Sequence, residues 1–353
     1  MLKLDKRLKV LIVSLKWTDA TPGRPLSSAY IFVNTLLRSG LGTPITFFCD
    51  EHIHKNHTEC DEAFIKICHQ EHPDLLFLLP TQLDIQTQIN NGTQSRPKFY
   101  LFPRNHCIQW VRSKFGIPVI NAVGDAYGRD AFNRFESMSA FSDKILLFDP
   151  ESDFLKWTAT PKKYALLWCP VSQGLYNSNG QQRDISISFI GRTHSLNIGE
   201  QIAPENPLHQ YAYREQFLQK IISQGVPVFR AGGAQNHHPL SAEMVANYFQ
   251  RSKIALNLTY QSPGKQLIRG RSWEALNCGA MLLEEENRAI RYFLEPMKHY
   301  VPFAGVDDAI EKSSYFLSND TERQSIAEHG YQIVRDRYNE AGFWSECLKL
   351  IYR

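Results

Sequence analysis

Cationic side chains gather in a short polar stretch late in the chain, directly before a carboxylate. Lys265, Arg269 and Arg271 stand within seven residues of one another, and Glu274 follows them. Lysine and arginine side chains, together with the free backbone N–H groups at a helix N-terminus, bind phosphate oxygens. A carboxylate one helical turn further on can accept hydrogen bonds from sugar hydroxyls. This spacing therefore predicts a site for a ligand with both a phosphate and a sugar, such as a nucleotide sugar.

The residues around this stretch predict the elements that hold it. An apolar run over 254–258 predicts a buried strand, and a second run over 280–283 predicts another. Between them we expect a polar loop over 259–264, with ordinary turn residues, and a short helix over 272–277 that opens around Ser272. Arg271 is then expected in the loop. Gly279 and Ala280 are expected to let the helix end pack closely on the second strand.

The whole chain alternates short apolar runs with amphipathic stretches, which predicts parallel sheets in doubly wound α/β domains. Strands are expected over 9–14, 45–49, 75–79, 99–102, 118–121, 144–148, 164–168, 185–190, 227–229, 254–258, 280–283 and 300–303. Helices are expected over 27–38, 61–71, 208–223, 241–250, 272–277, 287–294, 306–317, 320–338 and 341–351.

With 353 residues, the chain exceeds the usual size of a single core, so we expect two domains. The Gly-, Ser-, Asn- and Gln-rich segment 170–184 is the predicted linker. The predicted division is a Rossmann-like domain over 1–172, a second Rossmann-like domain over 173–338 that carries the phosphate-and-sugar site, and a helix over 339–353 that crosses back to the first domain. The two domains are expected to face each other across a cleft, with ligands at the carboxyl ends of the strands.

The composition of the chain argues against several classes of protein, among them nucleic-acid-binding, secreted and membrane-spanning proteins. The chain is 43% hydrophobic and 21% charged, as in ordinary globular proteins, and its net charge of +3 comes without a Lys/Arg block, so nucleic acid is not expected as a partner. Seven widely spaced cysteines without a C-x-x-C pair predict free thiols in a reducing compartment. The apolar run over 10–13 is too short for a signal peptide, and no stretch approaches about 18 apolar residues. We expect a cytoplasmic protein without a transmembrane segment.

Histidines and cysteines crowd the region between residues 52 and 72, and these are residue types that bind zinc. Their spacing matches no familiar structural zinc site, so we expect a surface loop here and no bound metal. His237 and His238 form a second histidine group, in a loop before a predicted helix. They could lie over a nucleotide base, and a plain turn explains them equally well.

The second half of the chain resembles a known family. The motifs are FIGRTHS at 189–195, the helix that carries Arg214, ALNLT at 255–259, RSWEALNCGAMLL at 271–283 and the closing helices up to 338. In order and type they resemble the C-terminal domain of group 1 glycosyltransferases, and are most similar to the spore-coat-associated, CgeB-like branch. In the first half the resemblance is limited to GIPVINAVGDA at 116–126 and the run SDKILLF that follows.

The resemblance implies the two-domain GT-B fold and roles for particular residues. Arg192 takes the place of the family's phosphate-binding arginine, and Lys265 and Arg271 add positive charge beside the diphosphate. The family holds its donor with two glutamates eight positions apart. Glu274 matches the second, which binds the ribose, and Gln266 stands where the first, which binds the sugar, would be. The donor, a UDP- or GDP-linked sugar, is a substrate, so no cofactor and no metal are expected.

The acceptor is expected to be a hydroxyl group of a glycan, a lipid-linked molecule or a protein. Asp19, in the polar loop after the first strand, and Asp125, after the strand over 118–121, are the predicted general bases, and His106 is a further candidate. One alternative is a degenerate GT-B module that binds nucleotide or glycan without turnover. An NAD-dependent dehydrogenase is disfavoured, because no glycine-rich turn follows the first strand.

Overall fold

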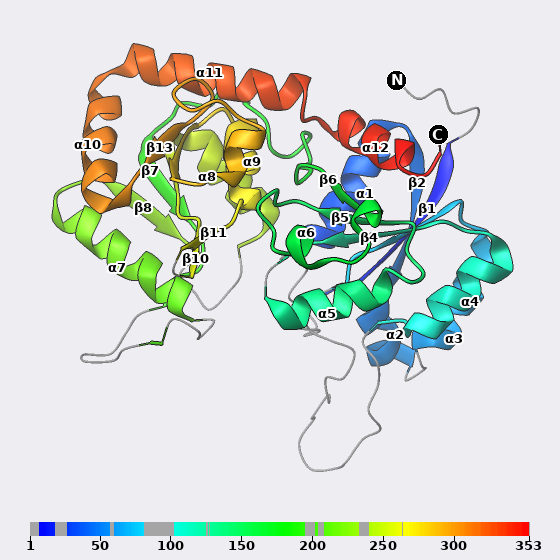
Figure 1. Cartoon of the computed structure of the whole chain (residues 1–353). Coiled ribbons are helices and arrows are strands. Elements are labelled where there is room, and N and C mark those ends of the chain that lie inside the picture. Colours follow the sequence, from blue (N-terminus) through cyan, green and yellow to red (C-terminus); the bar gives the residue numbers. More distant parts are fainter. Residues whose placement is uncertain are drawn as a thin grey trace. The chain divides into compact units, whose positions relative to one another are not determined.

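The chain forms two compact units in a computed structural model. The structure describes residues 7–17, 27–56, 60–80, 102–124, 126, 128–194, 202–203, 208–232, 240–262 and 264–352. Unit 1 comprises residues 1–170 together with 340–353, and unit 2 comprises residues 171–339 (Figure 1). Each unit contains one parallel sheet, and each is described by itself below.

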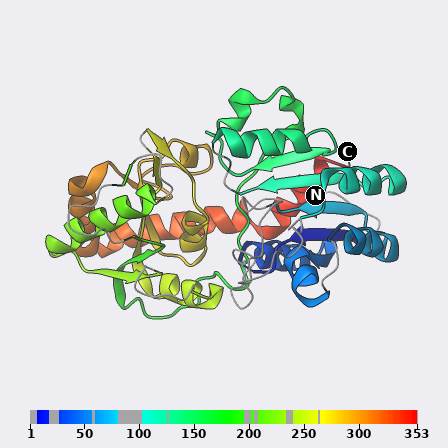
Figure 2. The same ribbon diagram turned by 90° about the horizontal axis from the view of Figure 1, so that it is seen from below.

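Unit 1 is built on a six-stranded parallel sheet in the order β2-β1-β3-β4-β5-β6. Its strands are β1 (Leu8–Ser14), β2 (Gly42–Phe48), β3 (Leu75–Leu78), β4 (Val119–Val123), β5 (Lys144–Leu147) and β6 (Tyr164–Leu166). Its helices are α1 (Ser27–Ser39), α2 (Cys49–Asn56), α3 (Cys60–Glu71), α4 (Asn105–Phe115), α5 (Arg129–Met138), α6 (Phe154–Trp157) and α12 (Glu340–Lys349). Figure 2 shows helices on both sides of this sheet, which explains why β3 and β4 are buried along their whole length.

The C-terminal helix α12 belongs to unit 1 and packs against α1. Trp344 is fully buried, lies against the ring of Phe77 with 5.0 Å between centroids, and donates its indole N–H to Thr35 Oγ1 at 3.1 Å. At the other end of α12, the Arg38 guanidinium pairs with Glu340 at 3.0 Å. The buried apolar side of α12 and these two polar contacts together hold the helix on unit 1.

Unit 2 is built on a five-stranded parallel sheet in the order β13-β12-β9-β7-β8. Its strands are β7 (Ile185–Ile190), β8 (Val228–Ala231), β9 (Ser252–Asn257), β12 (Met281–Glu285) and β13 (Val301–Phe303), with a separate hairpin of β10 (Tyr260–Ser262) and β11 (Lys265–Gln266). Its helices are α7 (His209–Ser223), α8 (Ala242–Arg251), α9 (Gly270–Asn277), α10 (Gly305–Ser318) and α11 (Asp320–Asp336). The strand order reverses between β7 and β9, and ligands of open parallel sheets bind at the carboxyl ends of the strands on either side of such a point.

The structure corrects four sequence predictions. Residues 287–294 form only a single 3-10 turn, over Ala289–Tyr292, instead of a helix. The histidine-rich segment after Phe48 begins with helix α2 rather than a loop, and His52 stacks on Phe47 with 4.6 Å between ring centroids. The loop over 259–264 contains strand β10 of the hairpin. Arg271 lies inside α9, because the extended backbone of Arg269 caps a helix that begins at Gly270.

The predicted linker over 170–184 is a packed part of unit 2. Tyr176 is fully buried, and Arg183 donates to the Ser252 carbonyl at 2.6 Å and the Cys278 carbonyl at 2.8 Å. These carbonyls follow α8 and α9, where helix ends leave acceptors without partners. This segment, which has the composition of a linker, therefore supplies hydrogen-bond donors to the C-terminal ends of two helices. The predicted strand over 99–102 lies outside the described residues, apart from Phe102.

Candidate functional site

The sequence-predicted cations of unit 2 gather at the carboxyl edge of its sheet. Arg192 follows the end of β7, and the hairpin with Lys265 and Gln266 follows the end of β9. β7 and β9 are the neighbouring strands between which the strand order reverses, so this edge is where a ligand is expected. Arg269, the N-cap residue of α9, brings the helix N-terminus to the same strand end.

Arg192 and Arg214 lie beside one aromatic ring. The Arg192 guanidinium is exposed and lies 5.5 Å from the ring centroid of Tyr211, while the Arg214 guanidinium lies 5.4 Å from the same centroid. Arg214 Nη1 also donates to the Arg192 carbonyl at 3.4 Å. Arg192, directly after β7, and Arg214, on α7, are therefore held close together. An anion bound here can contact both.

Arg214 is a buried cation whose guanidinium is only partly satisfied by the surrounding groups. It is 8% exposed, its Nε has no hydrogen-bond partner, and within the described ranges it forms no ion pair. Burial is the main cause that lowers the pKa of Arg214, to about 10; the like charge of Arg269 acts in the same direction, while Tyr211 and the Glu285 carboxylate act in the opposite one. An arginine in such surroundings is stabilised by an anion, because a buried charge without a counter-charge is costly. The expected anion is a phosphate.

The Glu285 carboxylate acts on Arg214 through its charge, while its oxygens accept hydrogen bonds from other groups. Glu285, at the end of β12, accepts the backbone N–H of Thr259 at 2.7 Å, that of Tyr260 at 2.8 Å and the Tyr213 hydroxyl at 2.5 Å. The ring of Tyr260 stacks on that of Tyr213 with 4.3 Å between centroids. Glu285 thus fixes the start of the β10–β11 hairpin, and Gln266 of β11 pairs with Tyr260 in its ladder.

Glu274 and Arg271 form an ion pair in the first half of α9, and the buried Tyr176 hydroxyl is bonded to both. Burial tends to lower the pKa of Arg271, but the Glu274 carboxylate outweighs this effect and the pKa is raised. Burial and the Glu274 charge together raise the pKa of Tyr176. The structure therefore gives Arg271 a close partner, unlike Arg214, and makes Glu274 a nearly buried carboxylate beside the helix start.

A second buried carboxylate, that of Glu284, holds the start of the same helix through hydrogen bonds. Glu284 is fully buried in β12 and accepts Asn257 Nδ2 at 2.9 Å and Ser272 Oγ at 3.0 Å. Asn257 ends β9 and Ser272 lies in the first turn of α9. Burial raises the pKa of Glu284 to about 8. This carboxyl joins the three segments that carry the site.

Both predicted general bases, Asp19 and Asp125, lie outside the described residues, as do His237 and His238. His106 is exposed in the first turn of α4. Burial, with a hydrogen bond to Asp61, raises the pKa of its neighbour Cys107 to about 12, so this thiol is not a nucleophile at neutral pH.

Two residues of the site were given no role by reasoning from sequence: Arg214, which was named only as part of a helix in the family motif, and Tyr176. Arg214 stands at an apolar position of α7, four residues before Leu218 and seven before Ile221, both fully buried. A cation in such a stripe is a usable signal for a buried anion site. Tyr176 gave no comparable signal, because its segment has the composition of a linker.

The later part of the chain also matches a family model. Residues 211–347 match the family described as glycosyl transferase-like. Solved structures resemble the whole chain. HepE from Anabaena, in complex with UDP and glucose, has a TM-score of 0.59 at 10% identity, covering 97% of this chain and 99% of its own. The fold is GT-B.

Two further structures agree with the GT-B fold, which confirms the predicted fold class. Sucrose-phosphate synthase from Thermosynechococcus elongatus has a TM-score of 0.61 at 10% identity, covering 98% of each chain. An α-glucosyltransferase bound to UDP-glucose and DNA with an abasic site has a TM-score of 0.60 at 10% identity, covering 99% of this chain and 100% of its own. No curated protein sequence matches the chain. In the described ranges of this GT-B chain, every helix is too short or too polar to cross a bilayer.

Proposed function

We propose that this protein is a glycosyltransferase that moves a sugar from a UDP-linked donor to a hydroxyl acceptor. The observation that carries the proposal is Arg214, a buried cation that forms no ion pair within the described residues and lies beside Arg192 and Arg269 at the carboxyl edge of a GT-B sheet. A diphosphate supplies the missing negative charge. UDP is preferred over GDP because HepE and the α-glucosyltransferase were solved with UDP and UDP-glucose.

The proposed reaction needs charge stabilisation at the leaving group. The acceptor oxygen bonds to the anomeric carbon, the bond from that carbon to the diphosphate oxygen breaks, and the acceptor proton passes to a base. Negative charge then grows on UDP, and fixed cations at that position lower the barrier. Arg192 and Arg214 serve this purpose in the proposal, with Lys265 on the hairpin, so the transfer requires no metal at the diphosphate. Asp19 or Asp125 is proposed as the base.

Further details of the proposal rest on the motifs. Gln266 is proposed to bond a donor hydroxyl with a neutral amide, Glu274 to hold the ribose, and Arg271 to add charge beside the diphosphate. Membership of the CgeB-like branch is likewise proposed from the motif order. The seven cysteines are all free thiols, which supports a cytoplasmic location.

The proposal is tested by binding and turnover measured together. UDP, GDP, ADP and CMP are compared by the rise in melting temperature, because a ligand of the native state raises apparent stability. UDP is expected to give the largest rise, and UDP-sugar consumption is then followed with and without candidate acceptors. A rise with UDP but no turnover with any donor favours the non-catalytic module, for which Gln266 is the supporting observation. No rise with any nucleotide contradicts the proposal.

Replacing Glu274 tests the ribose assignment. Glu274→Ala is expected to lower affinity for UDP about 10-fold in a calorimetric titration, the usual effect of one lost hydrogen bond to a charged group. Glu274→Gln keeps the shape and one acceptor, so it is expected to retain more affinity. The exposed Glu311→Ala on α10 is the matched control. Unchanged UDP affinity in both Glu274 variants would remove this residue from the ribose site.

Replacing Arg192 tests the diphosphate contact at the end of β7. Because Arg192 is exposed, Arg192→Ala is expected to leave the melting temperature unchanged. It is expected to lower kcat by about 10- to 100-fold, since loss of a preorganised charge costs a few kcal/mol in the transition state. Steady-state kinetics with a UDP-sugar measures this effect. An unaffected kcat would show that Arg192 lies outside the reacting site.

A further inference from the structure

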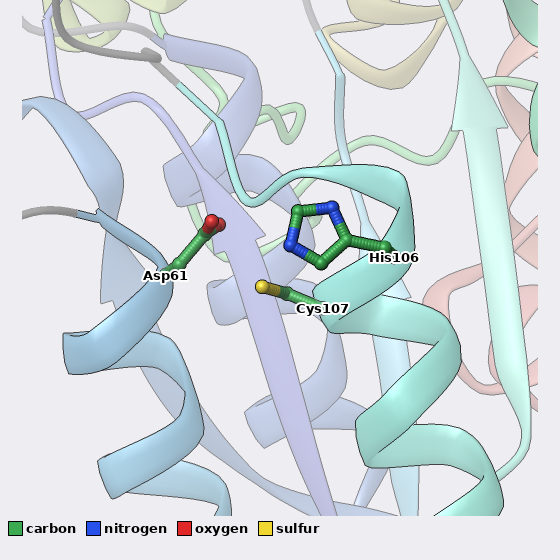
Figure 3. A group of neighbouring side chains, drawn as sticks. All are labelled: Asp61, His106 and Cys107. Carbon is green, nitrogen blue, oxygen red and sulfur yellow. The ribbon is translucent and has the colours of Figure 1, made fainter.

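Three potential metal ligands meet in unit 1, away from the donor residues in sequence and in element. They are Asp61 from the first turn of α3, and His106 and Cys107 from the first turn of α4. One ligand atom from each lies within 4.8 Å of the others. Figure 3 shows the His106 ring and the Cys107 thiol turned toward the Asp61 carboxylate. Asp61 and Cys107 are buried and His106 is exposed, so one side of the group is shielded from solvent and the other is accessible to it.

The position of this group in the fold is one where ligands bind. In a parallel sheet, the helix that follows a strand begins near the carboxyl end of that strand. α3 lies on the connection that follows β2, and α4 follows β3, so both helix starts lie at the carboxyl edge of the unit 1 sheet. This is the edge at which open α/β sheets hold their ligands.

We propose that Asp61, His106 and Cys107 form a binding site for a divalent cation of the zinc class. Thiolate, imidazole and carboxylate are the ligands that zinc takes, and three protein ligands leave the fourth tetrahedral position for water or another ligand. Metal–ligand bonds of about 2.0–2.3 Å place tetrahedral ligands about 3–4 Å apart, so a small inward movement of the exposed His106 completes the site. Binding replaces the Cys107 thiol proton, which leaves to solvent.

The environment of Asp61 suits a ligating carboxylate. The backbone N–H of Arg104 donates to Asp61 Oδ1 at 2.8 Å, and the Arg104 guanidinium pairs with Oδ2. Each carboxylate oxygen has a second lone pair; the Cys107 thiol is hydrogen-bonded to this carboxylate, and the loss of the thiol proton on binding frees that position for a metal. Hydrogen bonds of this kind orient ligating carboxylates in metal sites. Arg104 is therefore assigned as the residue that holds Asp61 in position, and a bound metal would join the starts of α3 and α4.

Cobalt(II) titration of the full-length protein tests the site, because cobalt substitutes for zinc and a cobalt–thiolate bond gives a charge-transfer band in the near ultraviolet. The wild-type protein is expected to bind one cobalt with this band, and zinc is expected to displace it. Cys107→Ser is expected to abolish the band. His106→Ala, at an exposed position, is expected to weaken binding at least about 10-fold without loss of folding.

Cys68→Ala is the control, since Cys68 is a buried thiol of the same helix α3 that is not part of the group. It is expected to keep the band and the wild-type affinity. The absence of a band in the wild-type protein overturns the proposal. A band that persists in Cys107→Ser, or wild-type affinity in His106→Ala, also overturns it, because other residues would then be the ligands.

Discussion

Arg214→Met is expected to remove most of the affinity for UDP while leaving the unliganded protein at least as stable as the wild type. The two effects have one cause. Arg214 is a buried charge that forms no ion pair among the residues the structure describes, so a methionine of similar length relieves the cost of its burial. The same substitution removes a charge-assisted contact to the diphosphate, which contributes about 1.5–3 kcal/mol. That corresponds to about 10- to 100-fold in the dissociation constant.

Calorimetric titration with UDP and thermal unfolding without ligand measure the two effects separately. Lys220→Met is the matched control, because Lys220 lies on the same helix α7 and is an exposed cation paired with Asp307 at 3.0 Å. It is expected to change neither UDP affinity nor stability appreciably, since exposed ion pairs contribute little. If Arg214→Met instead lowers stability and leaves UDP affinity unchanged, Arg214 is a structural residue and the main support for the proposed function is lost.

The sequence predicted the fold well because parallel sheets have a strong signature. Strands buried on both faces are short apolar runs, and β7 was predicted over its full length, Ile185–Ile190. The weaker predictions involve elements whose residues are polar or partly exposed. The hairpin β10–β11 has no buried residues, and its position depends on Glu285, which lies about 20 residues later in the chain.

The candidate site was predicted in part for a similar reason. Local spacing identified Arg192, Lys265 and Glu274, because each lies in or beside a recognisable motif. Local spacing could not show that Tyr176 contacts the pair of Arg271 and Glu274, or that Arg214 is buried without an ion pair in the described ranges, since these facts depend on contacts between distant segments. The residue with the clearest need for an anion was thus found only in three dimensions.

Glu284→Gln is expected to change how stability depends on pH. Burial, with a smaller contribution from the nearby Glu285 charge, raises the pKa of Glu284 from an ordinary value of 4.5 to about 8, although Asn257, Ser272 and Arg269 act in the opposite direction. Between about pH 4.5 and 8 the folded protein keeps a proton that the unfolded chain releases. Rising pH therefore favours unfolding in this window, with a slope that approaches about 1.4 kcal/mol per pH unit for a single group.

The measurement is the free energy of unfolding of the wild type minus that of Glu284→Gln, from denaturant titrations across pH 4 to 9. The glutamine cannot ionise and keeps hydrogen-bonding groups for Asn257 and Ser272, so other titrating groups largely cancel in the difference. The difference is expected to fall with pH up to about 8 and to level off above it, since both states are then ionised. The exposed Glu311→Gln serves as the control and is expected to lack this slope.

A flat difference would show that Glu284 is ionised in the folded protein at neutral pH. In that case the two donors, Asn257 and Ser272, would be sufficient to hold a carboxylate in the interior. If the difference in free energy of unfolding falls with pH, the Glu284 carboxyl that bonds the first turn of α9 is neutral in the folded protein at neutral pH. Above about pH 8 ionisation would place a negative charge beside Ser272, within reach of the Arg269 charge, and UDP affinity should fall over the same range because that charge competes with the diphosphate for the local cations.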